Sequence, residues 1–575
     1  MRKTSPHILA AVIMLMTAFT SWTQNIDLSG HKAVRDSINS MWLCSVPQEV
    51  FGTDWTAVVT TDPTWSQLSI NGALVAAGGT YTFQAIEGGK LYPFTALCNN
   101  ETVSGSITFT WLPVVEITGE FSDEYAPGTM SLYAPDLAMS KNNMRAQLKW
   151  RGGVTNFGER HKRNYHIQFL DAQGNQLSRR LLDMRKDNHW KLDAGQIDPL
   201  RVRNRVCSDL WLEMSRDPWF KSMDSTAING SRGRTAELIL NGKYHGIYGL
   251  IEPVDRKQLA LTKQDDATGT FHGEQWVAKS WARTYTFPMY DNLSDTWNGM
   301  EVCYPEFEEN VPTDWGTIYN AFEFARRADA VDDWQTFTDS LDYYFDTPVM
   351  EDYFIFAVSL QILDNEYKNI YYSCYDKALG APRLTMTAWD LDISVGAKSL
   401  VGMDDDFVSP ERGLDWFSHL PMLDMFNHSV PHRQHILDRY WELRETYLNT
   451  ENLIARFQRA VDELEQSGAA AREEARWSGD SDINGKTLDI SAEMEYIANW
   501  ITLRMDYLDK HIFAKTVLGD VNGDSIVGMD DLASLINHLL TGTPINEDNA
   551  DVETDGIVNM DDLTKLINFL LTGNL

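Results

Sequence analysis

The chain has 575 residues, 43% of them hydrophobic and 23% charged. That length suits about three or four folded domains, and the composition excludes a mostly disordered protein. The 49 basic and 82 acidic residues give a net charge of -33, which argues against nucleic acid as a partner because phosphate backbones are repelled. The five cysteines are too few for a scaffold built on disulfides.

The N-terminus predicts export. Arg2 and Lys3 precede an apolar run over residues 8–19, and short polar residues follow it. The run is too short to span a bilayer as a helix, and basic-then-apolar order at the start of a chain is typical of a signal peptide. We predict a signal peptide over residues 1–23 and a secreted or cell-surface protein. We expect no transmembrane segment. Residues 20–24 contain no cysteine, which argues against a lipid anchor.

Residues 24–112 contain short runs rich in β-branched and aromatic residues, separated by Gly, Asn, Asp and Pro. This pattern predicts an all-β, immunoglobulin-like sandwich. Cys44 and Cys98 lie near its two ends. In an exported chain they either form a disulfide between the sheets or remain as two buried free thiols.

Residues 113–515 mix strand-like and helix-like segments and predict an α+β domain. Within them, Asp364 and Asn369 stand five positions apart after an apolar helix, and Asp390 and Asp392 end a later strand. Phosphoryl transfer needs one carboxylate to position the attacking hydroxyl, and an Asn and a second carboxylate to hold metal ions. Protein kinases use the same order of residues. The alternative is that Asp390 and Asp392 form a structural hydrogen-bonding pair.

A nucleotide site also needs donors for phosphate oxygens. Arg151-Gly152-Gly153 ends one predicted strand, and Lys162-Arg163 begins the next. A glycine turn lets backbone N–H groups approach a phosphate, and a basic side chain supplies charge. The alternative, favoured by spacing alone, is a plain β-hairpin with a solvated basic edge.

These pieces occur in the order found in the spore-coat protein H (CotH) kinase-like family. The segment LILNGKYHGIYGLIEPVDR over residues 238–256 and the helix-like WITLRMDYLD over residues 500–509 add to the resemblance. It covers about residues 113–515. The resemblance implies an atypical protein kinase fold that uses ATP with Mg²⁺ or Mn²⁺ and acts on an extracellular protein substrate.

The same resemblance implies roles for the acidic residues. Asp364 would be the catalytic aspartate and Asn369 a metal or loop partner. Asp390 would be the metal-binding aspartate, with Asp392 supporting it.

For the nucleotide, the resemblance implies that Lys162 binds phosphate and that Arg151 contacts either the turn or a phosphate. Glu252 would lie near the nucleotide or be structural. Val154 departs from the family pattern, because it removes a hydroxyl that could face phosphate.

Residues 516–575 differ from the rest, with many acids and an internal repeat of period 31. Each copy offers oxygen ligands at the spacing of a twelve-residue calcium loop, followed by an amphipathic helix. The first loop offers Asp520, Asn522, Asp524, the Ile526 carbonyl and Asp531, and the second offers Asp551, Glu553, Asp555, the Ile557 carbonyl, Asn559 and Asp562.

This segment resembles a type I dockerin. The resemblance implies a small all-α domain, two Ca²⁺ ions, folding coupled to calcium and a cohesin domain as partner. The residues at loop positions 10 and 11 match between the copies, Met529-Asp530 and Met560-Asp561, so docking in two orientations is a hypothesis. Glu553 stands where Asn or Asp is usual.

The sequence therefore predicts a multidomain, secreted protein and leaves three hypotheses for its function. The first is a kinase that transfers the ATP γ-phosphate to a protein hydroxyl. The second is a non-catalytic pseudokinase that serves as a scaffold in an extracellular complex, for example one that degrades polysaccharides. The third is a glycosyl transferase that uses Asp390 and Asp392 on a nucleotide-sugar metal.

Overall fold

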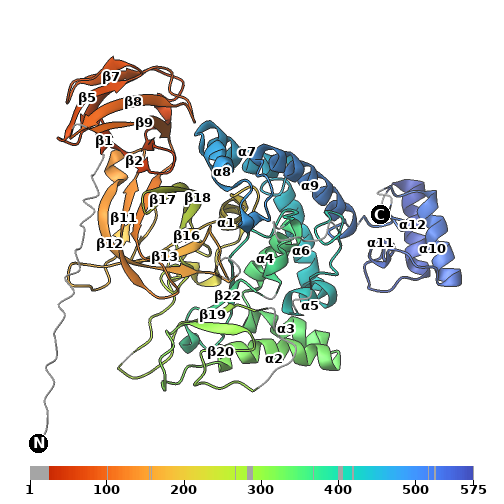
Figure 1. Ribbon diagram of the computed structural model, residues 1–575. Coiled ribbons are helices and arrows are strands. Elements are labelled where there is room, and N and C mark those ends of the chain that lie inside the picture. The colour runs from red at the N-terminus through yellow and green to blue at the C-terminus, as the bar shows by residue number, and fades with distance from the viewer. Residues whose placement is uncertain are drawn as a thin grey trace, which may run out of the picture. The chain divides into compact units, whose positions relative to one another are not determined.

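The computed structural model describes residues 25–573, apart from positions 100, 154, 155, 157, 266, 281–288, 367, 399–405, 418, 419, 516, 524 and 525. The predicted signal peptide lies outside the described residues. The chain divides into two compact units. The first holds the residues up to Ala194 with Arg234–Leu250 and Asp462–Asp482, and the second holds the remainder. Figure 1 shows the elements in chain order.

The N-terminal part of the first unit is β-rich, as predicted. Its strands form one nine-stranded sheet in the order β6-β5-β8-β9-β3-β2-β1-β4-β7, in which β3 and β9 are parallel. Side chains from strands near both edges, including Ile70 of β5 and Phe83 of β7, join a single core. The strands are β1 (Ile26–Leu28), β2 (His31–Asp36), β3 (Met41–Ser45), β4 (Trp55–Thr61), β5 (Trp65–Ile70), β6 (Ala73–Leu74), β7 (Thr80–Phe83), β8 (Tyr92–Cys98) and β9 (Glu101–Thr110).

Cys44 and Cys98 are both buried free thiols. Cys44 Sγ lies 3.5 Å from the His31 carbonyl, and Cys98 Sγ lies 3.5 Å from Thr64 Oγ1. Burial raises the pKa of the Cys44 thiol. Of the two alternatives that the sequence left open, the structure has the free thiols and not the disulfide.

The first unit also contains a closed barrel in the order β10-β11-β12-β13-β16-β18-β17. Its interior is a core of mainly aliphatic side chains with Trp190 and Tyr248. A short two-stranded sheet and the helix α8 complete this unit. The bounds are β10 (Val114–Gly119), β11 (Ala126–Tyr133), β12 (Lys141–Arg151), β13 (Asn164–Phe169), β14 (Arg179–Arg180), β15 (Lys186–Asp187), β16 (His189–Asp193), β17 (Gly233–Leu240), β18 (Lys243–Ile251) and α8 (Ala469–Trp477).

The second unit mixes helices with a five-stranded sheet in the order β20-β21-β19-β22-β23. The strands are β19 (Glu274–Ala278), β20 (Thr296–Trp297), β21 (Met300–Tyr304), β22 (Ile370–Cys374) and β23 (Thr385–Ala388). The helices are α1 (Arg203–Met214), α2 (Gly316–Val331), α3 (Trp334–Tyr344), α4 (Thr347–Leu360), α5 (Leu420–His428), α6 (Val430–Arg444) and α9 (Ile490–His511), and α7 (Thr450–Gln466) lies across the sequence boundary of the units.

Helix α4 is the central helix of the second unit. Nearly all of its side chains are buried, which fits its continuous apolar sequence. Pro348 stands in its first turn, where the missing N–H costs nothing. The helix ends at Gln361, whose φ of 48° is left-handed. The chain therefore turns sharply just before Asp364.

The C-terminal region is helical, as predicted. Its helices are α10 (Met529–Thr541), α11 (Glu547–Ala550) and α12 (Met560–Thr572). Leu535 of α10 and Leu566 of α12 share one small core. Figure 1 shows α10 and α12 side by side. Among the described residues, none of the helices has both the length and the apolar character needed to cross a bilayer.

Candidate functional site

The Asp364–Asn369 segment follows α4 and begins in a short 3-10 turn, Leu363–Asn365. Oδ2 of Asp364 accepts a hydrogen bond from Lys368 Nζ at 2.6 Å and one from Asn369 Nδ2 at 3.1 Å. Asn369 has a φ of 60°, a left-handed conformation that Asn tolerates better than most residues. The structure therefore brings the predicted Asp364 and Asn369 into direct contact.

Strand pairing brings the second acidic segment to the same place. Strand β22 starts directly after Asn369, and β23 ends directly before Trp389. The two strands are antiparallel, with Ile370 opposite Ala388. The Asp364–Asn369 segment and the Trp389–Asp392 segment therefore meet at one end of the sheet.

The side chain of Asn365 joins the two segments. Its Nδ2 donates to the Asn369 carbonyl at 3.0 Å and to the Trp389 carbonyl at 2.9 Å. Asn365 is completely buried, so water does not replace these bonds when they are lost. This residue fixes the spacing between Asn369 and the residue that precedes Asp390.

Asp390 and Asp392 are partly exposed. Asp390 has a φ of 62°, and such residues cluster at functional sites, where the surrounding structure maintains the strain. The next residue, Leu391, is buried and donates its backbone N–H to Asn204 Oδ1 at 3.1 Å. The buried Leu391 thus anchors the segment between two partly exposed aspartates.

Lys162 lies in the first unit and is only 1% exposed. Its ammonium is 3.2 Å from Oε1 of the fully buried Glu473 on α8. It also donates to the Ile247 carbonyl at 2.8 Å. The backbone N–H of Ile247 in turn donates to Glu473 Oε2 at 2.7 Å. Strand β18 therefore hydrogen-bonds to both members of the ion pair.

Gly246 is a residue of β18 that lies against Glu473. It has a φ of 101°, and a Cβ at this position would overlap the Glu473 carboxylate. The Lys162 ammonium also lies 4.3 Å from the centroid of the Tyr248 ring, a favourable cation–π distance. Burial, followed by the charge of Lys162, lowers the pKa of His245 to about 3. Neutral His245 therefore adds no charge beside the pair.

The basic hairpin near Lys162 is largely closed within the fold. Backbone N–H groups of His161 and Lys162 donate to Asp482 Oδ2 at 2.7 and 2.8 Å. Arg163 stacks 4.1 Å from the Trp150 ring and donates to the Arg160 carbonyl. Arg151 ends β12 and is partly buried, and Val154 lies outside the described residues.

Glu252 belongs to the second unit and is fully buried. Its two oxygens accept from Arg232 at 2.9 and 2.8 Å, and Gln258 donates to it at 3.1 Å. Bidentate pairing of this kind holds a carboxylate firmly. Of the two roles left open by the sequence, these contacts favour the structural one.

The first candidate calcium loop surrounds the start of α10. Asp531 is fully buried, and its oxygens accept from the N–H groups of Asn522 at 2.9 Å and Gly528 at 2.7 Å. Asp520 is also buried and accepts from Gly523 N–H at 2.9 Å. Ile526 is exposed, and the predicted ligand Asp524 lies outside the described residues.

The second loop repeats this arrangement around α12. Asp562 is buried and accepts from the N–H groups of Glu553 at 2.9 Å and Asn559 at 2.8 Å. Asp551 accepts from Asp555 N–H at 3.1 Å. Ile557 accepts from Asn559 Nδ2 at 3.2 Å. Both loops therefore place an aspartate at position 12 against the backbone of position 3.

The two repeats also expose equivalent apolar side chains. Met529 and Met560 are 66% and 61% exposed, and Leu540 and Leu571 are each 79% exposed. Ile536 and Ile567 are equivalent in the same way. α10 and α12 thus carry two similar apolar surfaces outside the small shared core.

The comparison with family models agrees with this geometry. Residues 148–508, more than half of the chain, match the model described as CotH kinase protein. The chain belongs to the CotH family. Residues 518–571 match the dockerin type I domain model. No curated protein matches the chain.

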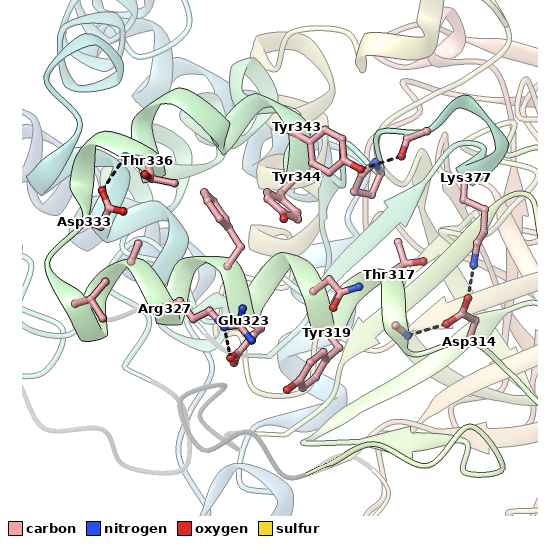
Figure 2. Close-up of a pocket in the computed structure, with 17 residues that line it drawn as sticks. Asp314, Thr317, Tyr319, Glu323, Arg327, Asp333, Thr336, Tyr343, Tyr344 and Lys377 are labelled. Carbon is pink, nitrogen blue, oxygen red and sulfur yellow. Dashed lines mark hydrogen bonds and ion pairs between the residues drawn. The ribbon is translucent and has the colours of Figure 1, made fainter.

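The CotH region contains a further cavity of about 720 Å³ beside α2 and α3 (Figure 2). Tyr319, Tyr343 and Tyr344 contribute to its lining, together with Lys377 and Asp314, which form an ion pair. The predicted acidic site residues are not among those that line it. The cavity is therefore a separate candidate surface for a ligand with polar and aromatic groups.

Two residues of the CotH region were not found by sequence reasoning. Asn365 is adjacent to Asp364, but nothing in the sequence distinguishes it from a solvent-exposed loop asparagine. Glu473 is 311 positions from Lys162, on a helix with several other charged residues. Only the fold brings it to the lysine.

Proposed function

We propose that this protein is a secreted CotH kinase that transfers the ATP γ-phosphate to a protein hydroxyl. In this proposal Asp364 accepts the proton of the attacking hydroxyl. Asp390 and Asn369 hold Mg²⁺ or Mn²⁺, and Asp392 supports Asp390. Bound metal would neutralise phosphate charge during transfer.

The side chain of Asn365 is the observation that carries this proposal. It bonds to the carbonyls of Asn369 and Trp389, and Asn369 bonds to Asp364. The residues predicted for proton transfer and for metal binding are therefore parts of one hydrogen-bonded unit. Carboxylate and amide oxygens are suitable ligands for Mg²⁺, so the side chains present fit the metal.

The Lys162–Glu473 pair adds support. Active protein kinases need an ion pair between a strand lysine and a helix glutamate. Lys162 lies two residues before the start of β13, and Glu473 lies in α8, with 3.2 Å between their charged groups. In the proposal Lys162 reaches the nucleotide phosphates when this pair opens to a ligand, and Arg151 contributes at the turn.

The alternative is a pseudokinase that binds partners without catalysis. The burial of Lys162 favours it, because an ammonium that is 1% exposed and already paired has little access to phosphate. The two proposals differ in one measurable property, which is transfer of phosphate.

The test uses the full, calcium-saturated chain with γ-labelled ATP and either Mg²⁺ or Mn²⁺. We expect label on the chain itself or on a generic protein acceptor, and its loss in Asp390→Ala and Asp364→Asn. Asp506→Asn, a change at an exposed aspartate of α9, is the control and should retain transfer. Absence of both labelling and ATP binding with either metal would support the pseudokinase.

We further propose that the dockerin segment binds two Ca²⁺ ions and docks to a cohesin domain. The buried, position-12 carboxylates Asp531 and Asp562 support ion binding, and the duplicated apolar surfaces support docking. Removing calcium with a chelator should unfold α10 and α12, because the ligands fold around the ion. Circular dichroism of the full chain would show a loss of helix when the chelator is added. The double variant Asp531→Ala, Asp562→Ala should show no such response to the chelator. Equal helicity with and without chelator would contradict this proposal.

A further inference from the structure

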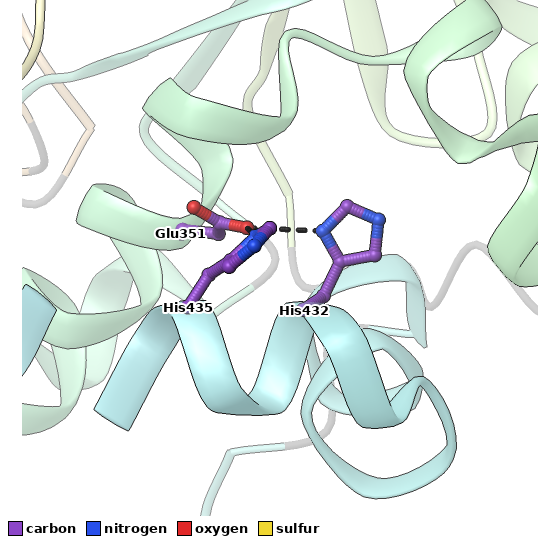
Figure 3. A group of neighbouring side chains, drawn as sticks. All are labelled: Glu351, His432 and His435. Atoms are coloured by element: carbon purple, nitrogen blue, oxygen red, sulfur yellow. Dashed lines mark hydrogen bonds and ion pairs between the residues drawn. The ribbon is translucent and has the colours of Figure 1, made fainter. Parts of the chain in front are cut away.

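Two histidines and a glutamate of the second unit converge far from the proposed kinase site. Glu351 is buried in α4, and His432 and His435 lie on α6. The histidines are three positions apart, so they share one face of the helix. Figure 3 shows both rings directed toward the Glu351 carboxylate.

The distances among these groups match the ligand shell of a metal ion. Nδ1 of His432 is 3.0 Å and Nδ1 of His435 is 3.4 Å from the same oxygen, Oε1 of Glu351. The three donor atoms all lie within 4.8 Å of one another. Zinc bonds of about 2.0–2.2 Å give a tetrahedron whose edges are about 3.3–3.6 Å. A single ion could therefore contact all three atoms with small adjustments.

Hydrogen bonding explains the contact of His432 with Glu351 at 3.0 Å, but it explains the contact of His435 less well. The separation of 3.4 Å between His435 and Glu351 is long for an N–H···O bond, which is commonly near 2.9–3.0 Å. The second oxygen of Glu351 is already held by Arg216 at 2.9 Å. Arg216 therefore orients the carboxylate and leaves Oε1 directed at the two imidazoles.

The surroundings also favour a cation with an open coordination position. The cluster lines a cavity of about 660 Å³. Its lining has six carboxylates and three guanidinium groups, so acidic groups are in excess. The His435 side chain is 63% exposed, which leaves the ion accessible to water. Three protein ligands with one open position are typical of accessible zinc sites.

We propose that Glu351, His432 and His435 bind Zn²⁺. Imidazole nitrogen with one carboxylate suits zinc, whereas Ca²⁺ and Mg²⁺ favour oxygen ligands. The ion would link α4 to α6 near the start of α4. Asp364 follows the other end of that helix, and the nine steps along the helix from Glu351 to Leu360 span about 14 Å at the helical rise. This site is therefore independent of the kinase proposal.

The experiment uses the full chain, stripped of transition metals and then saturated with calcium so that the dockerin loops are filled. Co²⁺ is the spectroscopic probe, and Zn²⁺ is added as its competitor. We expect one equivalent of Co²⁺ to produce visible absorption that Zn²⁺ abolishes. His435→Gln and His432→Gln should each weaken Co²⁺ binding at least tenfold. Loss of a residue that only supports a metal ligand already costs about tenfold or more, and loss of the ligand itself should cost at least as much.

His511→Gln changes an exposed histidine of α9 and is the matched control, with unchanged binding expected. The exposed His435 makes misfolding of its variant a minor concern, and circular dichroism without metal checks each variant. Zn²⁺ should also raise the unfolding temperature of the wild type and not of His435→Gln. The proposal is wrong if Co²⁺ does not bind, or if all variants bind it equally well.

Discussion

Two lysine–carboxylate pairs of the CotH region differ in how much solvent reaches them. In the first unit, the side chains of Lys162 and Glu473 are 1% and 0% exposed. In the second, those of Lys368 and Asp364 are 25% and 11% exposed. Burial alone therefore separates a pair that is closed within the fold from one that a ligand can reach.

The residues around each pair show the same contrast. Ile247 bonds to both members of the Lys162–Glu473 pair, so each charge has a polar partner. Beside the Asp364 pair, Asp390 keeps an unfavourable φ and stays partly exposed. The first pair is therefore enclosed by protein partners, whereas solvent reaches the acidic side chains of the second region.

The largest expected effect comes from breaking the closed pair. Glu473→Gln leaves the Lys162 charge buried without its counter-ion, which costs about 3–5 kcal/mol of unfolding free energy. Chemical denaturation would measure this loss. Glu451→Gln, at an exposed glutamate of α7, should change stability by less than about 1 kcal/mol.

Adding Lys162→Met to Glu473→Gln should recover much of that stability, because the uncompensated charge is removed as well. If Glu473→Gln is as stable as the Glu451→Gln control, the ion pair with Lys162 does not stabilise the fold.

A second buried carboxylate should make stability depend on pH. Burial, opposed by Lys377, raises the pKa of Glu274 from 4.5 to about 7. Between about pH 4.5 and 7, the Glu274 carboxyl is therefore protonated in the folded state and ionised in the unfolded state. The free energy of unfolding falls as pH rises through this window. The shift corresponds to about 3 kcal/mol.

Glu274→Gln removes this titration and serves as the reference. Denaturant unfolding at pH 5 and pH 8 should show a smaller decline for the variant than for the wild type. Equal declines would mean that Glu274 is ionised in both states and that burial does not control its charge.

The open region should be sensitive to the loss of Asn365. Asn365→Ala removes the two buried hydrogen bonds to the carbonyls of Asn369 and Trp389, which costs about 1–3 kcal/mol. Asn452→Ala removes an exposed amide that bonds the Thr446 carbonyl at 2.9 Å and should cost about 0.5 kcal/mol or less. Thermal unfolding of the two variants would measure the difference. Similar values would contradict the bridging role of Asn365.

The sequence predicted the local part of this site and missed the distant part. Asp364, Asn369 and Asp390 are recognisable because short spacings on a strand and its flanking turns survive folding. The family resemblance implied that Lys162 binds phosphate, but its partner comes from a helix 311 positions away. A pattern along the chain cannot distinguish a solvated lysine from one that a distant glutamate neutralises.

The smallest expected effect concerns one charge difference beside the two candidate calcium loops. Lys565 lies 3.8 Å from Glu553, a predicted ligand at position 3 of the second loop, and the matching residue of the first repeat is Ser534. Lys565→Ser removes a cation that competes with Ca²⁺, and the value of an exposed pair limits the gain to about five-fold in affinity. Ser534→Lys should weaken the first loop by a similar factor. Calorimetric calcium titration of the full chain would measure both, and the effects should shrink at high salt because exposed charges are screened. If neither exchange alters calcium affinity, the side chain at this position lies too far from the ion to matter.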